Sequence, residues 1–255
     1  MVHDHRVVVI MPALNAEKTL EKTYSEVPKD IVDEIILVDD QSSDATPELS
    51  KKLGIQTIVH LTNTGYGGNQ KTAYQAALKT QSDFIIMLHP DYQYSPKLIT
   101  SMAYLLDSGF YDVVLGSRIL GGGALRGGMP LYKYFFNRIL TAIQNILMGA
   151  KLSEYHTGYR AYRRKVLEVI PYLNNSNDFA FDAQLLSQAI FWGFSIGEIS
   201  CPTRYFSEAS SINFQRSVKY GIQCLITAFQ FRLAKWKLMS NALFIPQDRR
   251  SNKTT

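Results

Sequence analysis

Two adjacent carboxylates, Asp39 and Asp40, directly follow the apolar run of residues 35–38. A doubly wound sheet presents carboxylates at this point to a ribose or a base, because one carboxylate can accept two hydroxyl hydrogen bonds. The pair could instead cap a helix that begins near Thr46, a role that Asp44 could fill equally well. Their position after a strand favours a nucleotide site but does not by itself require one.

A second set of polar residues, His89, Asp91 and Gln93, alternates after the apolar run of residues 84–88. In an extended segment all three side chains would face one side and could reach a single cation. Carboxylate and amide oxygens suit Mg²⁺, whereas an imidazole moves the preference toward Mn²⁺ or another softer ion. Such a cation could bridge two phosphates and neutralise a leaving group. The alternative is an ordinary surface turn, which Pro90 supports.

The elements that must position these residues alternate between apolar strands and helices. The strands are predicted at residues 7–11, 35–38, 56–60, 84–88 and 113–115. Helix-start signals, a hydroxyl residue followed by proline, occur at Thr46-Pro47 and Ser95-Pro96. This βαβ alternation predicts the α/β class, with an open, mostly parallel sheet flanked by helices. Ligands should bind beyond the C-terminal ends of the strands.

Five loops are expected to meet at that edge of the sheet, and they carry most of the unusual polar residues of the first half. They span residues 12–17, 39–46, 63–71, 89–94 and 116–118. Five loops that converge on one edge define one site. The glycine-rich segment 121–128 follows them and predicts either a flexible loop that closes over a substrate or a passive connector.

Two later segments have apolar side chains at helical spacing, with polar side chains on a narrower side. In residues 131–150 the apolar set is Tyr132, Phe135, Phe136, Ile139, Leu140, Ile143, Ile146 and Leu147. Near the end of the chain it is Val218, Ile222, Leu225, Ile226, Phe229, Leu233 and Trp236. Such aromatic-rich, basic amphipathic helices could lie in a membrane interface. Packing in the core or in a dimer is the alternative.

The composition is globular, with 255 residues, 46% hydrophobic and 19% charged, and a formal net charge of +5. Cys201 and Cys224 lack the spacing of a disulfide framework or a zinc site, which favours a reducing, cytoplasmic setting. Neither a signal peptide nor an apolar stretch long enough to span a bilayer is visible. The net positive charge could favour anionic lipids or phosphorylated substrates, or could simply maintain solubility.

The ordered motifs resemble family 2 glycosyltransferases of GT-A fold. The strand and loop of residues 8–17 and the segment Glu34–Thr46, with its Val38-Asp39-Asp40, look like the family's opening half. The match continues through residues 63–71, 91–93, 116–118 and 157–163 and covers roughly residues 6–215. Any one motif is weak, but the ordered set is specific. The closest branch is that of dolichyl-phosphate mannose synthase and related polyprenyl-phosphate sugar transferases.

This resemblance implies a donor, a cation and an acceptor. Residues implied to bind the nucleotide-diphosphate sugar are Pro12, Ala13, Leu14, Glu17, Asp39, Asp40, Gly68, Lys71 and Asp91. Asp91 and Gln93, with His89 as a third candidate, are implied to hold a divalent cation, Mg²⁺ or Mn²⁺. Arg118 is implied to lie near the sugar or the acceptor phosphate. Arg204 follows a late predicted strand at residues 194–201 and is a further candidate for phosphate contact, since arginine offers a two-pronged donor; a solvated arginine is the alternative. The expected domains are a catalytic domain at 1–215, an amphipathic helical extension at 216–246 and a disordered tail at 247–255.

Three residues depart from the family pattern. His89 stands where aspartate is usual, which bears on the choice of metal and the need for one. Gln41 stands where glycine is common, and Gln184 stands where glutamate is common. Asp182 is the one obvious general-base candidate on its segment, and capping a helix at Ala183 is its structural alternative.

The expected reaction is an inverting sugar transfer in which Asp91, Asp182 and Arg118 are the catalytic candidates. A polyprenyl phosphate is the favoured acceptor, because it is already anionic and can attack without a base. The hydroxyl of a cell-surface polysaccharide or glycolipid is the alternative acceptor, and a non-catalytic nucleotide-sugar-binding protein is the alternative of another class. The protein is expected in the cytoplasm, peripheral to the membrane, and a homo-oligomer is left open.

Two further classes are disfavoured. A dinucleotide-dependent oxidoreductase needs glycines directly after the first strand, where this chain has residues Pro12–Asn15. Nucleic-acid binding needs a basic stripe interleaved with exposed aromatics. Residues 160–165 form the one dense basic cluster, and a solvated face explains it more simply.

Overall fold

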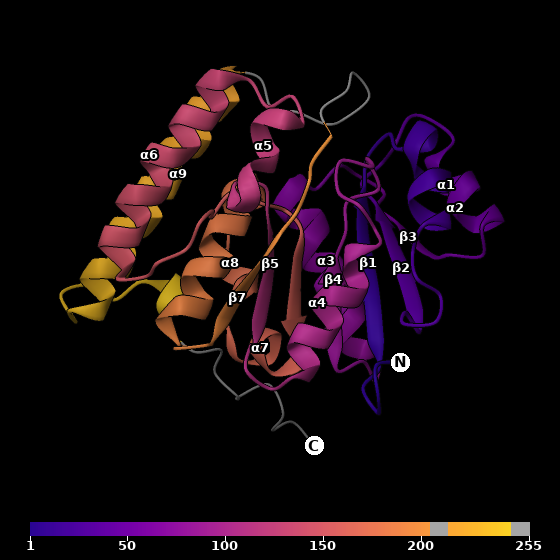
Figure 1. Cartoon of the computed structure of the whole chain (residues 1–255), viewed down its shortest axis with the longest axis horizontal. Helices are drawn as coiled ribbons and strands as arrows, with labels where there is room; N and C mark the ends of the chain where they lie inside the picture. The colour runs from indigo at the N-terminus through magenta and orange to yellow at the C-terminus, as the bar shows by residue number, and fades with distance from the viewer. Residues whose placement is uncertain (205–213, 246–255) are drawn as a thin grey trace.

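In a computed structural model of the chain, which describes residues 1–204 and 214–245, the strands form one mixed, seven-stranded sheet (Figure 1). The strands are β1 (Val7–Ala13), β2 (Glu34–Asp39), β3 (Gln56–Val59), β4 (Phe84–Met87), β5 (Val113–Ser117), β6 (Arg160–Arg163) and β7 (Ile196–Ser200). Their order across the sheet is β3-β2-β1-β4-β6-β5-β7. The five strands predicted from apolar runs are all present, so the α/β expectation is confirmed.

The sheet is parallel except around β6, which pairs antiparallel with both β4 and β5. Sequence alone did not predict β6, because it reads Arg-Ala-Tyr-Arg and lacks an apolar run. Its first residue, Arg160, is nonetheless fully buried. The strand therefore combines a buried guanidinium group with the side chains of Ala161 and Tyr162, which pack into the two cores on either face of the sheet.

Helices cover both faces of the sheet. They are α1 (Glu17–Ser25), α2 (Thr46–Lys52), α3 (Tyr66–Lys79), α4 (Leu98–Asp107), α5 (Gly123–Arg126), α6 (Leu131–Met148), α7 (Arg164–Val169), α8 (Ala180–Phe191) and α9 (Phe214–Lys235). Three 3₁₀ turns add to them: η1 (Leu120–Gly122), η2 (Tyr172–Asn174) and η3 (Ala242–Phe244). Side chains of β1 alternate between two cores: Val8 and Ile10 pack with α3 and α8, and Val7 and Val9 pack with α1 and α4.

Two details differ from the sequence expectations, and one expectation is not tested. The glycine-rich segment 121–128 forms most of η1 and the one-turn helix α5 rather than an open loop. Helix α4 begins at Leu98, two residues after the predicted Pro96, with the amide of Leu98 bonded to the Ser95 carbonyl. The boundary at residue 215 stays a prediction, because 205–213 lie outside the described residues, as does the predicted tail at 247–255.

Helices α6 and α9 lie side by side at the end of the molecule opposite α1 and α2 (Figure 1). In α6 the buried side chains are Asn137, Thr141, Gln144 and Met148. Its exposed apolar side chains are Leu131, Tyr132, Phe135, Phe136, Ile139 and Ile146, and those of α9 are Val218, Ile222, Ile226, Phe229 and, just beyond it, Trp236. Core packing is therefore wrong for these exposed side chains, whereas other members of the predicted apolar sets are partly buried, and Leu147 packs against the core.

In the part of the chain that the structure describes, no helix combines the length and the hydropathy needed to cross a bilayer.

Candidate active site

Asp39 and Asp40 lie where the sequence predicts them, at the C-terminal end of β2, and both carboxylates are buried. Asp39 accepts hydrogen bonds from the amide and the hydroxyl of Ser42. Asp40 accepts from His60 Nδ1 at 2.7 Å, from the amide and hydroxyl of Thr64 at 2.8 Å each, and from the Gly65 amide at 3.0 Å. The second carboxylate therefore holds the β3–α3 loop in place.

Hydrogen bonding changes the acidity of Asp40. Burial acts to raise its pKa, but the hydrogen bonds from His60, Thr64 and Gly65 outweigh burial and hold the pKa below its ordinary value. The carboxylate is consequently an anion over the whole neutral range, fixed at one edge of the crevice. None of these donors could be identified from the Asp-Asp motif, because all of them lie 20 or more residues away.

Gln41, which replaces the common glycine, adopts a left-handed backbone conformation with a φ of 65°. Glycine reaches this region without the steric penalty that a Cβ introduces. Here the side chain offsets that penalty, because its Nε2 donates to the Leu61 carbonyl and its Oε1 accepts from the Asn63 amide. Gln41 therefore ties the turn after the acidic pair to the β3–α3 loop.

The segment implied to cover the base is only partly a loop. Pro12 and Ala13 belong to β1, paired with Val38 and Asp39, and both are buried. Their expected place in a loop is wrong, because the β1–β2 pairing extends as far as Asp39. The exposed part begins at Leu14, which is 52% exposed, and includes Asn15 and Glu17.

Glu17 begins α1 and braces the loop that follows Asp40. Its carboxylate accepts from the Ala45 amide at 3.3 Å, and its own amide donates to Asp44 at 3.1 Å. Asp44 in turn accepts from the amide and hydroxyl of Thr46, so it serves the capping role that was considered for the acidic pair. Glu17 therefore positions the loop from its outer side.

The glycines of residues 63–71 serve a close contact between segments. A Cβ on Gly67 would stand 2.3 Å from the Ser176 carbonyl oxygen, and one on Gly68 would stand 2.8 Å from the Thr64 side chain. The amides of Gly67 and Gly68, in the first turn of α3, both point at the Asn177 carbonyl. The structure therefore uses this helix start to bind segment 175–177.

Lys71 is held by the same segment. Its ammonium donates to the Asn175 carbonyl and to Asn177 Oδ1 at 2.7 Å, and burial lowers its pKa. Gly68 and Lys71, both predicted to bind the nucleotide sugar, are thus bonded to segment 175–177, which precedes α8.

Residues 89–93 form a turn, so the expectation of an extended segment with three side chains on one side is wrong. Tyr92 adopts a φ of 58°, which reverses the chain. Asp91 Oδ1 accepts a hydrogen bond from the backbone N–H of Gln93 at 3.1 Å. The nearly buried Gln93 and the half-buried Asp91 stay close together. His89 turns instead toward Tyr66, whose hydroxyl oxygen lies 3.1 Å from His89 Nε2.

Arg204, predicted from its place after β7, lies against the same turn. Its amide donates to the Gln93 carbonyl at 3.2 Å, and its guanidinium group lies 5.4 Å from the centre of the Tyr92 ring. The ammonium of Lys22 lies 4.3 Å from that ring, so two cations contact one aromatic side chain. The structure therefore brings Arg204 next to the predicted cation loop, away from Arg118's partners.

Arg118 is bound to a residue that the sequence did not single out. Glu154, fully buried, accepts from the Arg118 amide and Nε at 2.9 Å each and also from Nη2. Asn137 of α6 donates to the same carboxylate at 2.9 Å. Burial raises the pKa of Glu154, but the Arg118 guanidinium outweighs burial and lowers it overall. Glu154 thereby fixes the guanidinium group beside α6.

Asp182 is nearly buried in the first turn of α8. Its carboxylate accepts from the Tyr66 hydroxyl at 2.6 Å and from Gln70 Nε2 at 3.2 Å. The helix begins at Ala180, so the alternative that Asp182 caps a helix at Ala183 is wrong. Both oxygens of the proposed base are occupied by side chains of α3.

The basic cluster at residues 160–165 is not the solvated face that the sequence suggested. Arg160 donates to the carbonyls of Tyr155, Thr157 and Asp182. Arg163 donates to the Leu106 carbonyl near the end of α4, and Arg164 donates to carbonyls at the end of α3. Arg163 and Arg164 thus bond carbonyls near the C-terminal ends of α4 and α3, where helices leave carbonyls unpaired, whereas Arg160 bonds carbonyls of the segment before β6 and of the first turn of α8.

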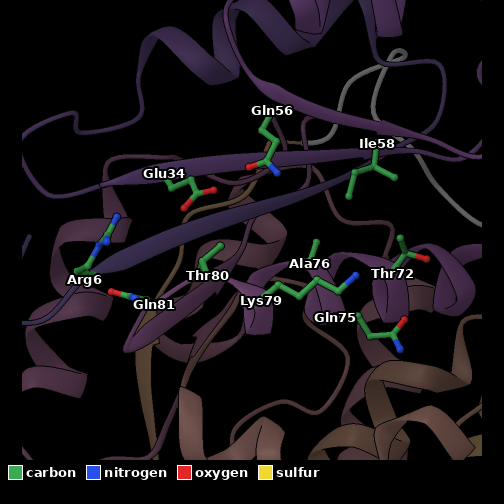
Figure 2. A pocket seen from close by; sticks show the side chains of 10 residues that line it. All are labelled: Arg6, Glu34, Gln56, Ile58, Thr72, Gln75, Ala76, Lys79, Thr80 and Gln81. Carbon is green, nitrogen blue, oxygen red and sulfur yellow. The ribbon is translucent and has the colours of Figure 1, made fainter.

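A groove of about 670 Å³ lies at the N-terminal ends of the parallel strands, opposite to the ends that carry Asp39 and Asp40 (Figure 2). Arg6, Glu34 and Gln56, which line it, stand at the N-terminal ends of β1, β2 and β3, and Lys79 ends α3. Parallel α/β sheets bind ligands at the C-terminal ends of their strands. The groove in Figure 2 is therefore separate from the site built around Asp39 and Asp91.

The protein groups available as metal ligands near Asp91 suit a cation that a substrate helps to hold. Among residues 1–204 and 214–245, no three His, Cys, Asp or Glu side chains are grouped to hold a metal ion. Asp91 offers a carboxylate that accepts from the backbone N–H of Gln93, and Mg²⁺ commonly binds through one or two carboxylates together with substrate phosphates. A substrate-bridged cation fits this arrangement, and a closed protein cage does not.

Comparison with known proteins identifies the family. The model described as glycosyl transferase family 2 matches residues 8–170. The chain belongs to this family. It is therefore a glycosyltransferase, as its motifs suggest.

Its relatives include two transferases of known name. A dolichyl-phosphate hexose transferase of Haloferax volcanii is 30% identical over 78% of this chain and 82% of its own. A polyprenol monophosphomannose synthase of Mycolicibacterium smegmatis is 27% identical over 76% of each chain.

Among solved structures, glucosyl-3-phosphoglycerate synthase from Mycobacterium tuberculosis in complex with UDP aligns with a TM-score of 0.68 at 17% identity. The alignment covers 93% of this glycosyltransferase and 82% of that chain. The same synthase is also known with Mn²⁺ and UDP-glucose, and with Mg²⁺ and UDP. This likeness confirms the GT-A fold.

Proposed function

We propose that this glycosyltransferase moves a sugar, with inversion, from a nucleotide diphosphate to a polyprenyl phosphate at a membrane surface. The observation that carries the proposal is the orientation of α6, which turns its polar side inward and its apolar side outward beside Arg118. A lipid-linked acceptor needs both an anion site and an apolar surface next to it. The names of the Haloferax and Mycolicibacterium relatives, which refer to dolichyl phosphate and to polyprenol, support the acceptor.

The exposed face of α6 and α9 supports a peripheral position on the membrane. Large side chains such as Phe135, Phe136 and Ile146 are 62%, 53% and 74% exposed. Each would gain on the order of 1 kcal/mol on leaving water, since fully burying such a side chain is worth about 1.5–3 kcal/mol. We place the enzyme on the cytoplasmic face, where nucleotide sugars are available to a protein in a reducing compartment.

The acceptor phosphate would bind near Arg118 and Lys133. Lys133 projects from the first turn of α6, and its pKa is lowered by burial and then by the positive charge of Arg118, so the two cations are neighbours. Two cations beside a buried Glu154 leave a net positive charge at the inner margin of the apolar face. A phosphate monoester carried by a lipid matches that charge.

The donor would bind at the C-terminal ends of β1, β2 and β4. Asp39 and Asp40 would contact the nucleoside, with Leu14 and Glu17 at the outer side of the crevice. A divalent cation held by Asp91 and Gln93 would neutralise the departing diphosphate. Arg204, held against the Gln93 backbone, adds a positive charge at the same turn.

The state of Asp182 favours a phosphate acceptor over a hydroxyl acceptor. A sugar hydroxyl needs a general base within hydrogen-bond reach, whereas a phosphate is already anionic. Both oxygens of Asp182 accept from α3 side chains, so this carboxylate holds Tyr66 and Gln70 instead of a substrate proton. Transfer to a polysaccharide or glycolipid hydroxyl has no comparable support.

The proposal is tested in two steps. A thermal-shift screen of UDP, GDP, CDP and dTDP sugars, each with Mg²⁺ or Mn²⁺, should identify the donor, because a ligand of the folded state stabilises it. The selected donor is then supplied with vesicles that contain a polyprenyl phosphate or with soluble saccharides. Transfer to the lipid phosphate alone is expected. Transfer to a soluble hydroxyl instead, or a dimer that hides α6 and α9 in the active enzyme, would refute the lipid acceptor.

A further inference from the structure

We infer that the α6–α9 flank, formed by residues 131–151 and 214–245, docks on a bilayer that contains anionic lipids and selects those lipids through its lysine and arginine side chains. The inference rests on the proposed function, since it names the kind of membrane on which the acceptor is met. It adds a chemistry that the apolar face alone does not specify, because apolar side chains enter neutral and anionic bilayers alike.

Positive charge is concentrated on this flank. Residues 131–151 and 214–245 contain eight lysine and arginine residues and no aspartate or glutamate. Because the whole chain has a formal net charge of +5, all the other residues together carry −3. An anionic surface therefore attracts the flank and weakly repels the rest of the molecule, which orients the protein as it approaches.

Three of these cations gather where the two helices end. Gly221 of α9 lies against the Leu140 side chain of α6, and Arg232 donates to the Ile146 carbonyl at 2.6 Å. The helices therefore run in the same direction, and their C-terminal ends lie together (Figure 1). The exposed lysines at this end are Lys151, Lys235 and Lys237.

Further cations stand where the two helices begin. Lys133 lies in the first turn of α6, and Lys219 lies in the second turn of α9. Lys219 pairs with Asp178 at 3.0 Å, but the two side chains are 64% and 44% exposed. Such an exposed pair contributes little to stability, so Lys219 can exchange its partner for a lipid phosphate. Between the two ends, Arg138 donates instead to the Ser153 carbonyl.

Aromatic side chains at both ends of the flank suit the boundary between lipid and water. Tyr132 begins the exposed face of α6, and Trp236 directly follows α9. The Arg232 guanidinium group lies 5.4 Å from the centre of the Trp236 ring. Tyrosine and tryptophan prefer the headgroup level because one end of each ring system is apolar and the other is polar. The flank thus has an apolar middle and basic, aromatic ends.

A bilayer matches this flank better than a second copy of the chain does. In a twofold dimer each flank would face its own copy and would set eight cations against eight, with no carboxylate of either flank to pair with them. Anionic headgroups supply the missing charge, and acyl chains cover apolar side chains such as Phe135 and Ile146. Each lysine or arginine near an anionic surface strengthens binding by about 5-fold.

Vesicle binding by the full chain tests the inference. The protein is sedimented with vesicles of phosphatidylcholine alone, or of phosphatidylcholine mixed with phosphatidylglycerol, both without acceptor. It should bind the anionic vesicles at least about 10-fold more tightly. This preference should disappear at about 1 M salt, where the Debye length falls to about 3 Å.

Two double variants locate the charge that matters. Lys151→Gln with Lys237→Gln removes two exposed charges from one end of the flank. It should weaken binding to anionic vesicles by about 10- to 30-fold and leave binding to neutral vesicles unchanged. Lys51→Gln with Lys52→Gln is the matched control, because it removes two exposed lysines from α2, at the opposite end of the molecule (Figure 1). It should bind both kinds of vesicle as the wild type does.

The outcomes separate this inference from the proposed function. Equal binding of the wild type to neutral and anionic vesicles overturns the inference, and so does equal weakening by the two double variants, which would trace the preference to net charge. Sugar transfer to a polyprenyl phosphate in neutral vesicles is measured separately. Transfer without any preference for lipid charge removes the inference alone, whereas a clear preference without transfer removes the proposed function alone. The thermal midpoint shows whether each variant is folded, and the wild-type comparison decides the question if one is not.

Discussion

The crevice and the α6–α9 flank treat polar and apolar groups in opposite ways. Around the crevice, buried charges such as Asp40 and Glu154 are each surrounded by hydrogen-bond donors. On the flank, by contrast, large apolar side chains are exposed to water. The buried charges of the crevice are therefore satisfied within the protein. The flank is arranged for a second, apolar environment, which is the strongest reason to place the acceptor there.

The largest expected effect concerns the Arg118–Glu154 pair, where the two regions meet. Arg118→Met leaves a fully buried carboxylate without its guanidinium partner, which should cost about 3–5 kcal/mol of unfolding free energy. Glu154→Gln should cost less, because the Arg118 side chain is 13% exposed and can reach water. Denaturant unfolding of both variants measures the difference. Equal losses of unfolding free energy would show that an unpaired Glu154 carboxylate is no more costly than an unpaired Arg118 guanidinium group.

The next effect concerns the flank itself. Phe135→Ser with Ile139→Ser should weaken binding to vesicles by about 100-fold, or roughly 2.7 kcal/mol, because two exposed apolar side chains no longer enter the interface. Folding stability should change little, since both side chains already face water. Co-sedimentation with vesicles measures the binding.

A matched control for the flank is Phe110→Ser, which changes a side chain that is 78% exposed but belongs to neither α6 nor α9. It should leave vesicle binding unchanged. If Phe110→Ser weakens binding as much as the double variant, general hydrophobicity explains the association and the flank has no special role.

A smaller effect is expected at Asp182. A general base contributes about 10²–10⁴-fold to a rate, so its replacement by asparagine should nearly abolish transfer if it takes a proton. We expect Asp182→Asn to keep activity within about 10-fold of the wild type. The amide oxygen can still accept from Tyr66, and Gln70, whose Oε1 has no partner, can turn to accept from the new amide. Transfer rates at saturating donor and acceptor decide between the two roles.

The sequence predicted the strands that are continuous apolar runs and located both acidic loops. It missed β6, since two arginines in four residues hide a strand whose first guanidinium group is buried against the carbonyls of Thr157 and Asp182. It predicted α6 but did not determine which face of this helix points to solvent, because helical periodicity gives two faces without saying which one packs on the core. Direction depends on neighbours such as Glu154, which bonds Asn137.

The sequence predicted where the site residues lie better than it predicted which residues they contact. Asp39, Asp40 and Asp91 lie at the expected strand ends, but the partners that determine their behaviour are far along the chain. His60 and Tyr66 are examples: His60 ends a predicted strand and Tyr66 lies in the motif of residues 63–71, yet nothing in the local pattern states which side chain either one contacts. Hydrogen bonds across 20 or more residues depend on the folded path and cannot be inferred from spacing.

The smallest effect tests the crevice side of the comparison through pH. The folded-state pKa of Asp40 is below its ordinary value, so its carboxylate contributes stability at neutral pH. That contribution is present above the unfolded pKa and is lost as pH falls through the folded pKa. Asp40→Asn should therefore be less stable than the wild type at pH 7, and the difference should shrink in acid. Urea midpoints measured from pH 7 downward test this. A difference that stays constant with pH would mean that the His60 and Thr64 hydrogen bonds do not favour the ionised carboxylate.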